Sequence, residues 1–224
     1  MKPQATTPAD TRMMGIIHDA LRRDLERTRH ALTERPYPEN GQREAIADHL
    51  RWMMRYLHDH HSSEDRGLWP LLRRKAPTAA QLLDSMEKDH ADIAHAMAAV
   101  EAAAQRYAAS GTDETRTGLL DALTALDDAL LPHLRREEDE TMPVAAAALT
   151  SAEWHAWEQD FHIKQRSLTE LGDEGHWLLD SLDTTRYQIV VRQVPAIPRF
   201  ILLRGFAGRY RRRAARRWGF GPRR

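Results

Sequence analysis

The sequence predicts an all-α protein: an up-down-up-down antiparallel four-helix bundle with a C-terminal helical extension. Proline and glycine divide the first 145 residues into four long segments of helical length. Within each segment, apolar residues recur every three or four positions, the spacing of a helix that buries one face. No strand pattern precedes residue 185. Long amphipathic helices joined by short connections favour a bundle in which neighbouring helices run in opposite directions.

Helix-breaking residues bound each of the four bundle segments. We expect helices at about residues 10–34, 42–66, 78–109 and 112–140. The breaks between them contain Pro36, Gly41, Pro77 and Gly111, and Pro143 follows the last segment. These residues end helices because proline lacks a backbone N–H and glycine adopts conformations outside the helix.

The rest of the chain predicts a helical extension. Further helices are expected at about residues 150–171, 184–194 and 198–217. Thr150 and Glu153 form a capping-box pattern, and Pro198 suits a first helical turn. The predicted domains are therefore a bundle over residues 1–145 and an extension over residues 146–224.

Composition excludes several classes of protein and site. The chain has no cysteine, so disulfides, thiolate-bound zinc, iron–sulfur clusters and cysteine nucleophiles are excluded. It has no run of about 20 apolar residues that could cross a membrane. The first residues lack the apolar core of a signal peptide, so we expect a cytoplasmic protein.

Charge is distributed unevenly along the chain. Residues 184–224 contain 12 arginines and no Asp, Glu or Lys. Because the chain holds 33 basic and 33 acidic residues, the first 183 residues carry 21 basic against 33 acidic groups, a net charge of −12. Such a tail can bind nucleic acid or an anionic membrane. We favour the alternative that it docks on the acidic bundle through the apolar residues Phe200, Leu203, Phe206, Tyr210 and Trp218.

Each bundle helix carries a histidine on its apolar stripe, and the four histidines fall at one depth in the bundle. They are His18, His60, His90 and His133. Glu64 and Glu137 complete two copies of a His-x3-Glu pattern, which puts each glutamate on the same helix face as the preceding histidine. A single seam histidine is usually an ordinary core residue. Two buried carboxylates are costly without a cation, however, so the six residues together predict a dinuclear metal site.

The residue types narrow the choice of metal. Four imidazoles and two carboxylates suit iron, and by ligand chemistry also manganese, cobalt or zinc. Two bridging carboxylates with open coordination positions favour a redox-active iron pair over closed structural zinc sites. Ferritin-like di-iron bundles use Glu-x-x-His, so that class is disfavoured.

The pattern resembles the hemerythrin-like, or HHE, domains. Residues 10–145 reproduce their order of motifs: a histidine, His-x3-Glu, a histidine and His-x3-Glu, with similar tails ending Leu68-Trp69-Pro70 and Thr141-Met142-Pro143. The resemblance implies a non-haem centre of two iron ions, oxo- or hydroxo-bridged when oxidised. It implies His18 and His60 on one iron, His90 and His133 on the other, and Glu64 and Glu137 bridging both.

One departure from the family pattern bears on activity. Oxygen-carrying hemerythrins have a fifth histidine one turn after the first histidine of the third helix, where this chain has Ala94, and His95 lies about 100° further around the helix. We therefore expect a protein that binds and activates dioxygen or peroxide, as an oxidase, oxygenase or peroxidase, rather than a simple carrier. The alternatives are a sensor or store of oxygen, nitric oxide or iron, and a regulator that binds nucleic acid through the arginine tail.

Other residues near the motifs have weaker claims. Tyr56, one turn before His60, is a candidate redox-active phenol or partner of a ligand, and otherwise a core aromatic. Asp65 and Glu138 either orient ligand histidines or face solvent. His49 lies about 16 Å along its helix from His60, too far to share an ion. The remaining histidines are expected at the surface or behind the ligands: His30, His58, His61, His155, His162 and His176.

Overall fold

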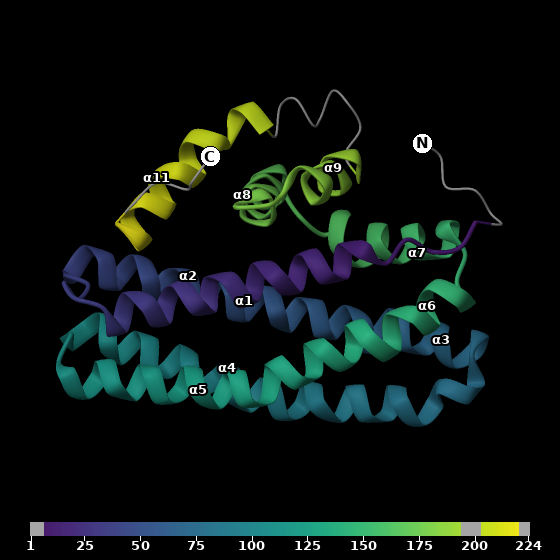
Figure 1. Cartoon of the computed structure of the whole chain (residues 1–224), viewed down its shortest axis with the longest axis horizontal. Helices are drawn as coiled ribbons and strands as arrows, with labels where there is room; N and C mark the ends of the chain where they lie inside the picture. Colours follow the sequence, from purple (N-terminus) through teal and green to yellow (C-terminus); the bar gives the residue numbers. More distant parts are fainter. Residues whose placement is uncertain (1–6, 194–202, 220–224) are drawn as a thin grey trace.

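A computed structural model describes residues 7–193 and 203–219 of the chain. Regular structure in these residues is helical and includes no strand, which confirms the all-α prediction. Four long helices lie side by side along the longest axis of the molecule (Figure 1). They are α1 (Arg12–Thr33), α2 (Asn40–Ser63), α4 (Ala80–Ser110) and α5 (Asp113–Arg136).

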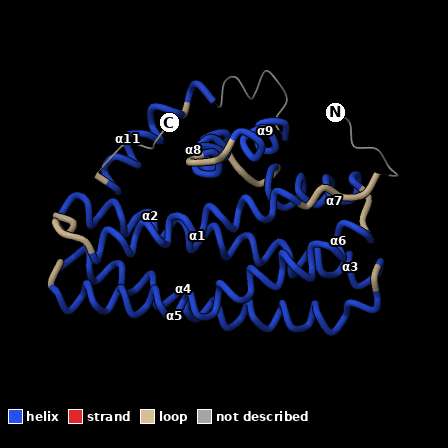
Figure 2. The backbone as a smooth tube through the Cα atoms, in the orientation of Figure 1, coloured by secondary structure: helices blue, strands red, loops and turns tan. Residues whose placement is uncertain are grey.

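The helix boundaries follow local backbone chemistry. Gly111 ends α4 in the left-handed conformation, at φ 63°, which glycine adopts without a steric penalty. Thr112 then caps α5, because its hydroxyl accepts a hydrogen bond from the backbone N–H of Thr115. The polypeptide therefore reverses direction within two residues between α4 and α5 (Figure 2).

Two π-helical segments interrupt the bundle at the repeated motif. They are η1 (Glu64–Leu68) and η3 (Glu137–Thr141), and each begins at the glutamate of a His-x3-Glu pattern. Each is followed by a short α-helix, α3 (Trp69–Lys75) or α6 (Met142–Ala148), with proline in its first turn. The wider turn suits these sequences because a proline ring crowds the carbonyl four residues before it.

The predicted helix ends near these motifs are therefore wrong. We expected helices to stop near Arg66 and Glu140, but the backbone continues through both π segments. The N–H of Trp69 donates to the carbonyl of Glu64, five residues back, and Met142 donates to Glu137 in the same way. After α3, a short turn, η2 (Pro77–Ala79), leads into α4.

The core consists of two apolar clusters, one on each side of a polar layer. The larger cluster includes Leu21, Leu57, Ile93 and Leu130. The smaller cluster surrounds the π segments and includes Met14, Leu68, Met86 and Met142. On α1, His18 lies between Met14 of the smaller cluster and Leu21 of the larger one. On α4, His90 lies in the same way between Met86 and Ile93. Apolar side chains therefore pack against the polar layer on both sides.

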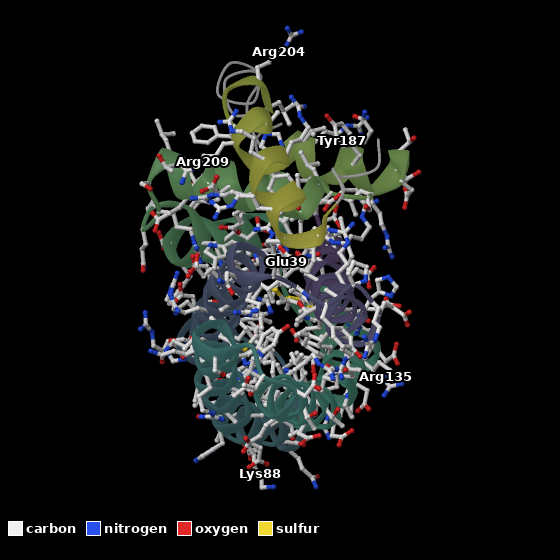
Figure 3. All side chains as sticks on the ribbon, turned by 90° about the vertical axis from the view of Figure 1, so that its left-hand side faces the viewer. Glu39, Lys88, Arg135, Tyr187, Arg204 and Arg209 are labelled. Carbon is white, nitrogen blue, oxygen red and sulfur yellow. The ribbon has the colours of Figure 1, made fainter. Side chains whose placement is uncertain are left out.

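The C-terminal extension covers the side of the bundle formed by α1 and α2 (Figures 1 and 3). It comprises α7 (Ser151–Glu158), η4 (Gln159–Ile163), α8 (Leu168–Leu179), α9 (Thr184–Gln193) and α11 (Ala207–Trp218). The predicted single helix over 150–171 is wrong. A second capping box, formed by Ser167 and Glu170, starts α8 as a separate helix.

The arginine-rich segment docks on the bundle, as favoured from the sequence. Tyr210 and Trp218 on α11 are buried and belong to the larger apolar cluster. Phe206 packs where α8 has Gly172, so closely that a Cβ there would lie 2.4 Å from its ring. Leu203 is half-buried, whereas Phe200 and Pro198 lie outside the described residues. Docking therefore rests on the buried α11 side chains.

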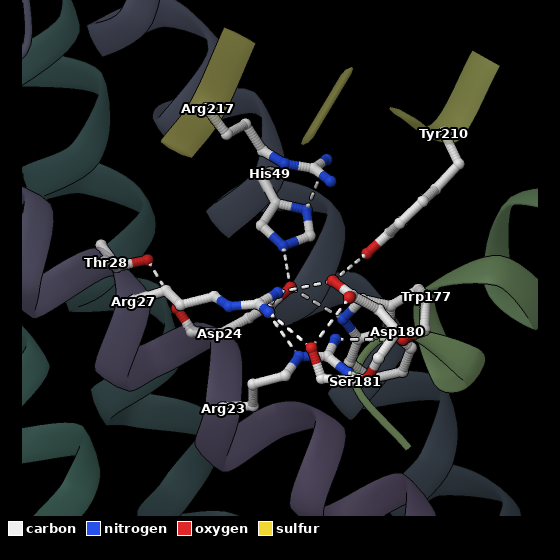
Figure 4. A network of polar contacts seen from close by, with 10 residues as sticks. All are labelled: Arg23, Asp24, Arg27, Thr28, His49, Trp177, Asp180, Ser181, Tyr210 and Arg217. Carbon is white, nitrogen blue, oxygen red and sulfur yellow. Dashed lines mark hydrogen bonds and ion pairs between the residues drawn. The ribbon is translucent and has the colours of Figure 1, made fainter. Parts of the chain in front are cut away.

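A buried polar network joins α11 and α8 to the bundle (Figure 4). Asp24 accepts hydrogen bonds from Nε2 of His49 at 2.7 Å and from Nε1 of Trp177 at 3.0 Å. Arg217 donates to Nδ1 of His49 at 3.2 Å, and the hydroxyl of Tyr210 donates to Asp180 at 2.9 Å. His49 therefore belongs to the interface between the bundle and the extension. This agrees with the prediction that it lies too far from His60 to share an ion.

Candidate metal centre

The six predicted ligand residues converge in the polar layer between the apolar clusters. One histidine comes from each long helix, and each glutamate is the first residue of a π segment. All six are buried, and none is more than 5 % exposed. They are His18, His60, Glu64, His90, His133 and Glu137. The backbone therefore brings together every residue that the motifs predicted.

Side-chain atoms in this layer form two groups with metal-binding geometry. The first group is His18, His60 and Glu137, and the second is His61, His90 and His133. Within each group, one potential ligand atom from every residue lies within 4.8 Å of the others. Two adjacent groups suit two ions rather than one.

The two glutamates span both groups. The carboxylate of Glu64 lies 3.0 Å from Nε2 of His60 through one oxygen and 3.5 Å from Nε2 of His90 through the other. An oxygen of Glu137 lies 3.4 Å from Nε2 of His18 and 3.8 Å from Nε2 of His133. Each carboxylate therefore reaches an imidazole in each group, which is the placement of a bridging ligand.

Many polar atoms of this layer lack a hydrogen-bond partner within the described residues. They include the Nε2 atoms of the five histidines in the two groups and both carboxylate oxygens of Glu64 and Glu137. Buried polar atoms are rarely left unpaired because their desolvation is unfavourable. Imidazole nitrogens and carboxylate oxygens that face one another without a hydrogen-bond partner suit transition-metal cations.

Burial sets the protonation of these groups. It raises the pKa of Glu64 well above its usual value, and the neighbouring Glu137 charge adds to the effect. Burial also holds the pKa values of His60 and His61 well below 6.5, with further repulsion from neighbouring imidazoles. The two histidines are therefore neutral at pH 7, with lone pairs available for a metal.

Acidic residues behind the layer hold three of the histidines in place. Nδ1 of His18 donates to Glu138, and Nδ1 of His90 donates to Asp65, both at 2.7 Å. These contacts fix the tautomer that leaves Nε2 facing the centre. Of the two roles left open by the sequence, the structure favours orientation of the ligands over exposure to solvent. Asp89, which the sequence reading missed, accepts from Nδ1 of His133 at 3.3 Å and also pairs with Arg136.

Comparison with known families agrees with this geometry. The sequence model of the hemerythrin HHE cation binding domain matches residues 11–145, more than half of the chain. The chain belongs to the hemerythrin HHE cation-binding family. No curated protein and no solved structure matches it. The family match confirms the resemblance inferred from the six-residue pattern.

The position of His61 differs from the one expected from the sequence. We placed it at the surface or behind the ligands, but it is buried within the second group. Its ring stacks on that of His90, with centroids 4.1 Å apart and planes at 5°, and lies 5.2 Å from the ring of His133. The corresponding residue of the second motif is Leu134. The twofold repeat is therefore broken at this position, and the doublet His60-His61 was the available signal.

The positions considered for the fifth hemerythrin histidine lie outside the layer. Ala94 and His95 are both exposed, and Nδ1 of His95 bonds the carbonyl of Ala91 at 2.8 Å. His30 and His58 are also exposed, as expected. His61 is thus the additional imidazole that this centre offers.

Tyr56 lies directly behind one of the ligand histidines. Its ring is nearly parallel to that of His60, at a centroid separation of 6.5 Å. Burial raises the pKa of Tyr56 well above 10, and the charge of the nearby Glu174 adds to the effect. The guanidinium of Arg166 lies 5.4 Å from the ring centroid. The phenol is therefore protonated and held beside the centre.

Proposed function

We propose that this hemerythrin-like protein holds a non-haem di-iron centre that binds and activates dioxygen or peroxide. The observation that carries the proposal is the pair of buried glutamates, each lying between two groups of histidines with no hydrogen-bond partner for its oxygens among the described residues. Two cations would neutralise both carboxylates and occupy the inward-facing imidazole nitrogens.

The ligand assignment follows the two groups. His18 and His60 would hold one iron, His90 and His133 the other, and Glu64 and Glu137 would bridge them. His61 would add a third imidazole to the second iron. We also infer that α1, α2, α4 and α5 form the up-down-up-down bundle of the family. Iron suits this mixture of nitrogen and oxygen donors, and a bound pair supplies redox chemistry toward dioxygen or peroxide.

The surrounding residues prepare the site for that chemistry. The apolar clusters on both sides exclude bulk water. Glu138 and Asp65 keep His18 and His90 in the tautomer that binds metal. Tyr56 keeps its proton at neutral pH and places it beside Glu174. These features support oxidase, oxygenase or peroxidase activity.

The second candidate function is reversible binding of oxygen or nitric oxide by a sensor or store. His61 favours it, because a fifth imidazole leaves fewer coordination positions open on one iron. The docking of the arginine-rich α11 on the bundle argues against a free nucleic-acid-binding or membrane-binding arm. None of the described helices is both long and apolar enough to cross a membrane.

Controlled exposure of the reduced, iron-loaded protein to air separates the two candidates. If the centre activates oxygen, the optical spectrum changes to that of an oxidised centre and does not revert when oxygen is removed under argon. Full recovery of the reduced spectrum would overturn activation and support reversible binding. Glu64→Ala provides the control, since loss of a bridging carboxylate should abolish both behaviours together with metal binding.

A further inference from the structure

A row of aromatic rings on α2 leads from the metal centre toward the surface. Trp52, Tyr56 and His60 are spaced one helical turn apart and lie on one face of the helix. The rings of Tyr56 and His60 are 6.5 Å apart at 6°, and those of Trp52 and Tyr56 are 5.6 Å apart at 25°. Trp177 on α8 packs against both Trp52 and Tyr56, at 5.0 Å and 4.9 Å. The π systems therefore adjoin one another along the whole row.

The outer end of this row opens into a groove between the bundle and the extension. The groove has a volume of about 720 Å³, and Trp52 and Tyr56 are both in its wall. Trp52 is half-buried, whereas Tyr56 is 2 % exposed and His60 only 1 %. A molecule in the groove can thus touch the indole of Trp52 but cannot touch the metal ligands.

The polar wall of the groove suits a small, neutral aromatic molecule. Four arginines and four carboxylates line it, so the groove has no net charge to select an anion or a cation. Among them, Asp173 pairs with both Arg209 and Arg213. Such residues supply hydrogen bonds to hydroxyl groups, while Trp52 offers an aromatic surface. A phenol or hydroquinone combines these two features and fits the volume.

A carboxylate that can accept the phenol proton lies close to Tyr56. Loss of an electron makes a phenol strongly acidic, so a radical forms readily only where a base takes the proton. The carboxylate of Glu174 lies near the hydroxyl of Tyr56 and 3.5 Å from Arg166. The proton can move to Glu174 when the electron leaves and return when an electron arrives.

We propose that Trp52 and Tyr56 carry electrons from the groove to the metal centre, and that a small phenol or hydroquinone binds in the groove as their donor. The inference rests on the proposed function, because peroxide must first oxidise the centre. Each donor electron passes through Trp52 to Tyr56, which regains its proton from Glu174. In total, one hydroquinone loses two electrons and two protons, and one hydrogen peroxide gains them to form two waters.

Phenylalanine substitutions test the two ends of this path. Tyr56→Phe keeps the ring in place and removes the oxidisable phenol. Tyr107→Phe is the matched control, because Tyr107 is an equally buried tyrosine at the far end of α4. Trp52→Phe keeps an aromatic wall in the groove and removes the indole. Iron content and melting temperature confirm that each variant is folded and loaded.

The measurements are the optical change of the centre with peroxide, freeze-quench EPR of the organic radical, and the rate at which 1,4-hydroquinone removes that radical. We expect a tyrosyl radical in the wild type and in Tyr107→Phe, and at least a tenfold lower yield in Tyr56→Phe. In Trp52→Phe the radical should form normally and react with hydroquinone at least tenfold more slowly.

Four results would contradict these expectations, each in a different way. A wild-type radical yield in Tyr56→Phe overturns the path at its inner end. A wild-type reaction with hydroquinone in Trp52→Phe overturns entry through the groove. If peroxide leaves the optical spectrum of the loaded wild type unchanged, the peroxide reaction of the proposed function fails and the path fails with it. A normal optical response without any organic radical rejects the path alone.

Discussion

At the residue scale, His61 makes the two halves of the centre chemically different. The His-x3-Glu repeat implies equal halves, yet the structure adds an imidazole to one of them, where the other has Leu134. A ring stacked at 4.1 Å on His90 with a free Nε2 is placed to share the same ion. In the proposed di-iron centre, this asymmetry would leave different numbers of open coordination positions on the two ions.

Replacing His61 with leucine, the residue of the second repeat, tests whether it binds metal. We expect His61→Leu to retain the fold and to weaken binding of one of two ions at least tenfold, because one nitrogen ligand is lost. Competition with a chelator measures both affinities. His58→Leu is the control, since His58 is exposed on the same helix. Equal affinities in His61→Leu and wild type would remove His61 from the ligand set.

The acidic residues behind the ligands lead to a second prediction at this scale. Asp65→Asn and Glu138→Gln should each lower metal affinity about 10- to 100-fold, because the paired imidazole loses its orienting carboxylate. The reason is the 2.7 Å contact of each with a ligand Nδ1. Asp139→Asn, at an exposed neighbouring position, should leave the affinity unchanged. Unaltered metal affinity in all three variants would show that these contacts are dispensable.

At the element scale, the first π segment, η1, packs against the extension. Gly67 lies within η1, and a Cβ there would come within 2.5 Å of the Phe161 ring and 2.8 Å of Trp157. The indole of Trp157 also donates to the carbonyl of Ser63 at 3.1 Å. The first π segment is therefore a packing surface for α7 and η4 as well as the support of Glu64.

Substitution of two glycines by alanine should have opposite effects on stability. Gly67→Ala should destabilise the protein by about 1–3 kcal/mol, because two aromatic rings must shift. Gly118→Ala should stabilise it by up to about 1 kcal/mol, since a Cβ there meets nothing within 4 Å and alanine favours the helix α5. Urea unfolding of the two variants measures both changes. A stabilising Gly67→Ala would mean that the extension does not pack on η1.

The sequence predicted the long helices of the bundle better than the details near the site. Apolar periodicity and proline or glycine breaks locate α1, α2, α4 and α5 to within a few residues. The same signals cannot distinguish an α-helix that ends from one that widens into a π turn, because both retain helical periodicity. Likewise Ser167 and Glu170 form a capping box that marks the start of α8, although the apolar pattern alone extends the preceding helix.

The six-residue motif likewise predicted the residues that meet but not all of their neighbours. His-x3-Glu spacing places side chains on one face of one helix, so convergence of the four helices brings the six together. His61 lies about 100° around the helix from His60. It faces the centre because α4 and α5, which carry His90 and His133, lie on that side of α2. Asp89 was missed for the same reason, since its partner His133 is on another helix.

At the scale of the whole molecule, the extension and the bundle share a buried polar interface centred on His49. Burial lowers the pKa of His49 to about 4, and the charge of Arg217 adds to this effect, against the opposing hydrogen bond to Asp24. The geometry agrees, because a neutral ring donates from Nε2 to Asp24 and accepts at Nδ1 from Arg217. Arg23 on α1 faces the same cluster through Asp24.

The depressed pKa of His49 predicts a loss of stability in mild acid. Above pH 6.5 the imidazole is neutral in both the folded and unfolded chains. Between pH 6.5 and 4 only the unfolded chain binds the proton, so stability falls by about 3 kcal/mol at roughly 1.4 kcal/mol per unit. The carboxyl of Asp24 has a lowered pKa, because its bonds to His49 and the nearby arginines outweigh burial, and it loses its contribution only below this range.

His49→Gln isolates this contribution, because a glutamine amide can keep both hydrogen bonds and does not titrate. Unfolding free energies of wild type and variant, compared from pH 7.5 to 4, should diverge below pH 6.5, with the wild type losing more. Other histidines titrate alike in both proteins and cancel in the difference. Parallel pH profiles would place the pKa of His49 near its ordinary value and reject the neutral tautomer.

The proposed centre is a pair of irons held by buried histidines and two bridging glutamates. The most direct test is the metal content of protein expressed in iron-rich medium, purified without chelators and measured by mass spectrometry against protein concentration. We expect two irons per chain in the wild type. Both should be lost together in Glu64→Ala and in Glu137→Ala, because each carboxylate lies between both groups of histidines. A stoichiometry near one, or zinc in place of iron, would contradict it.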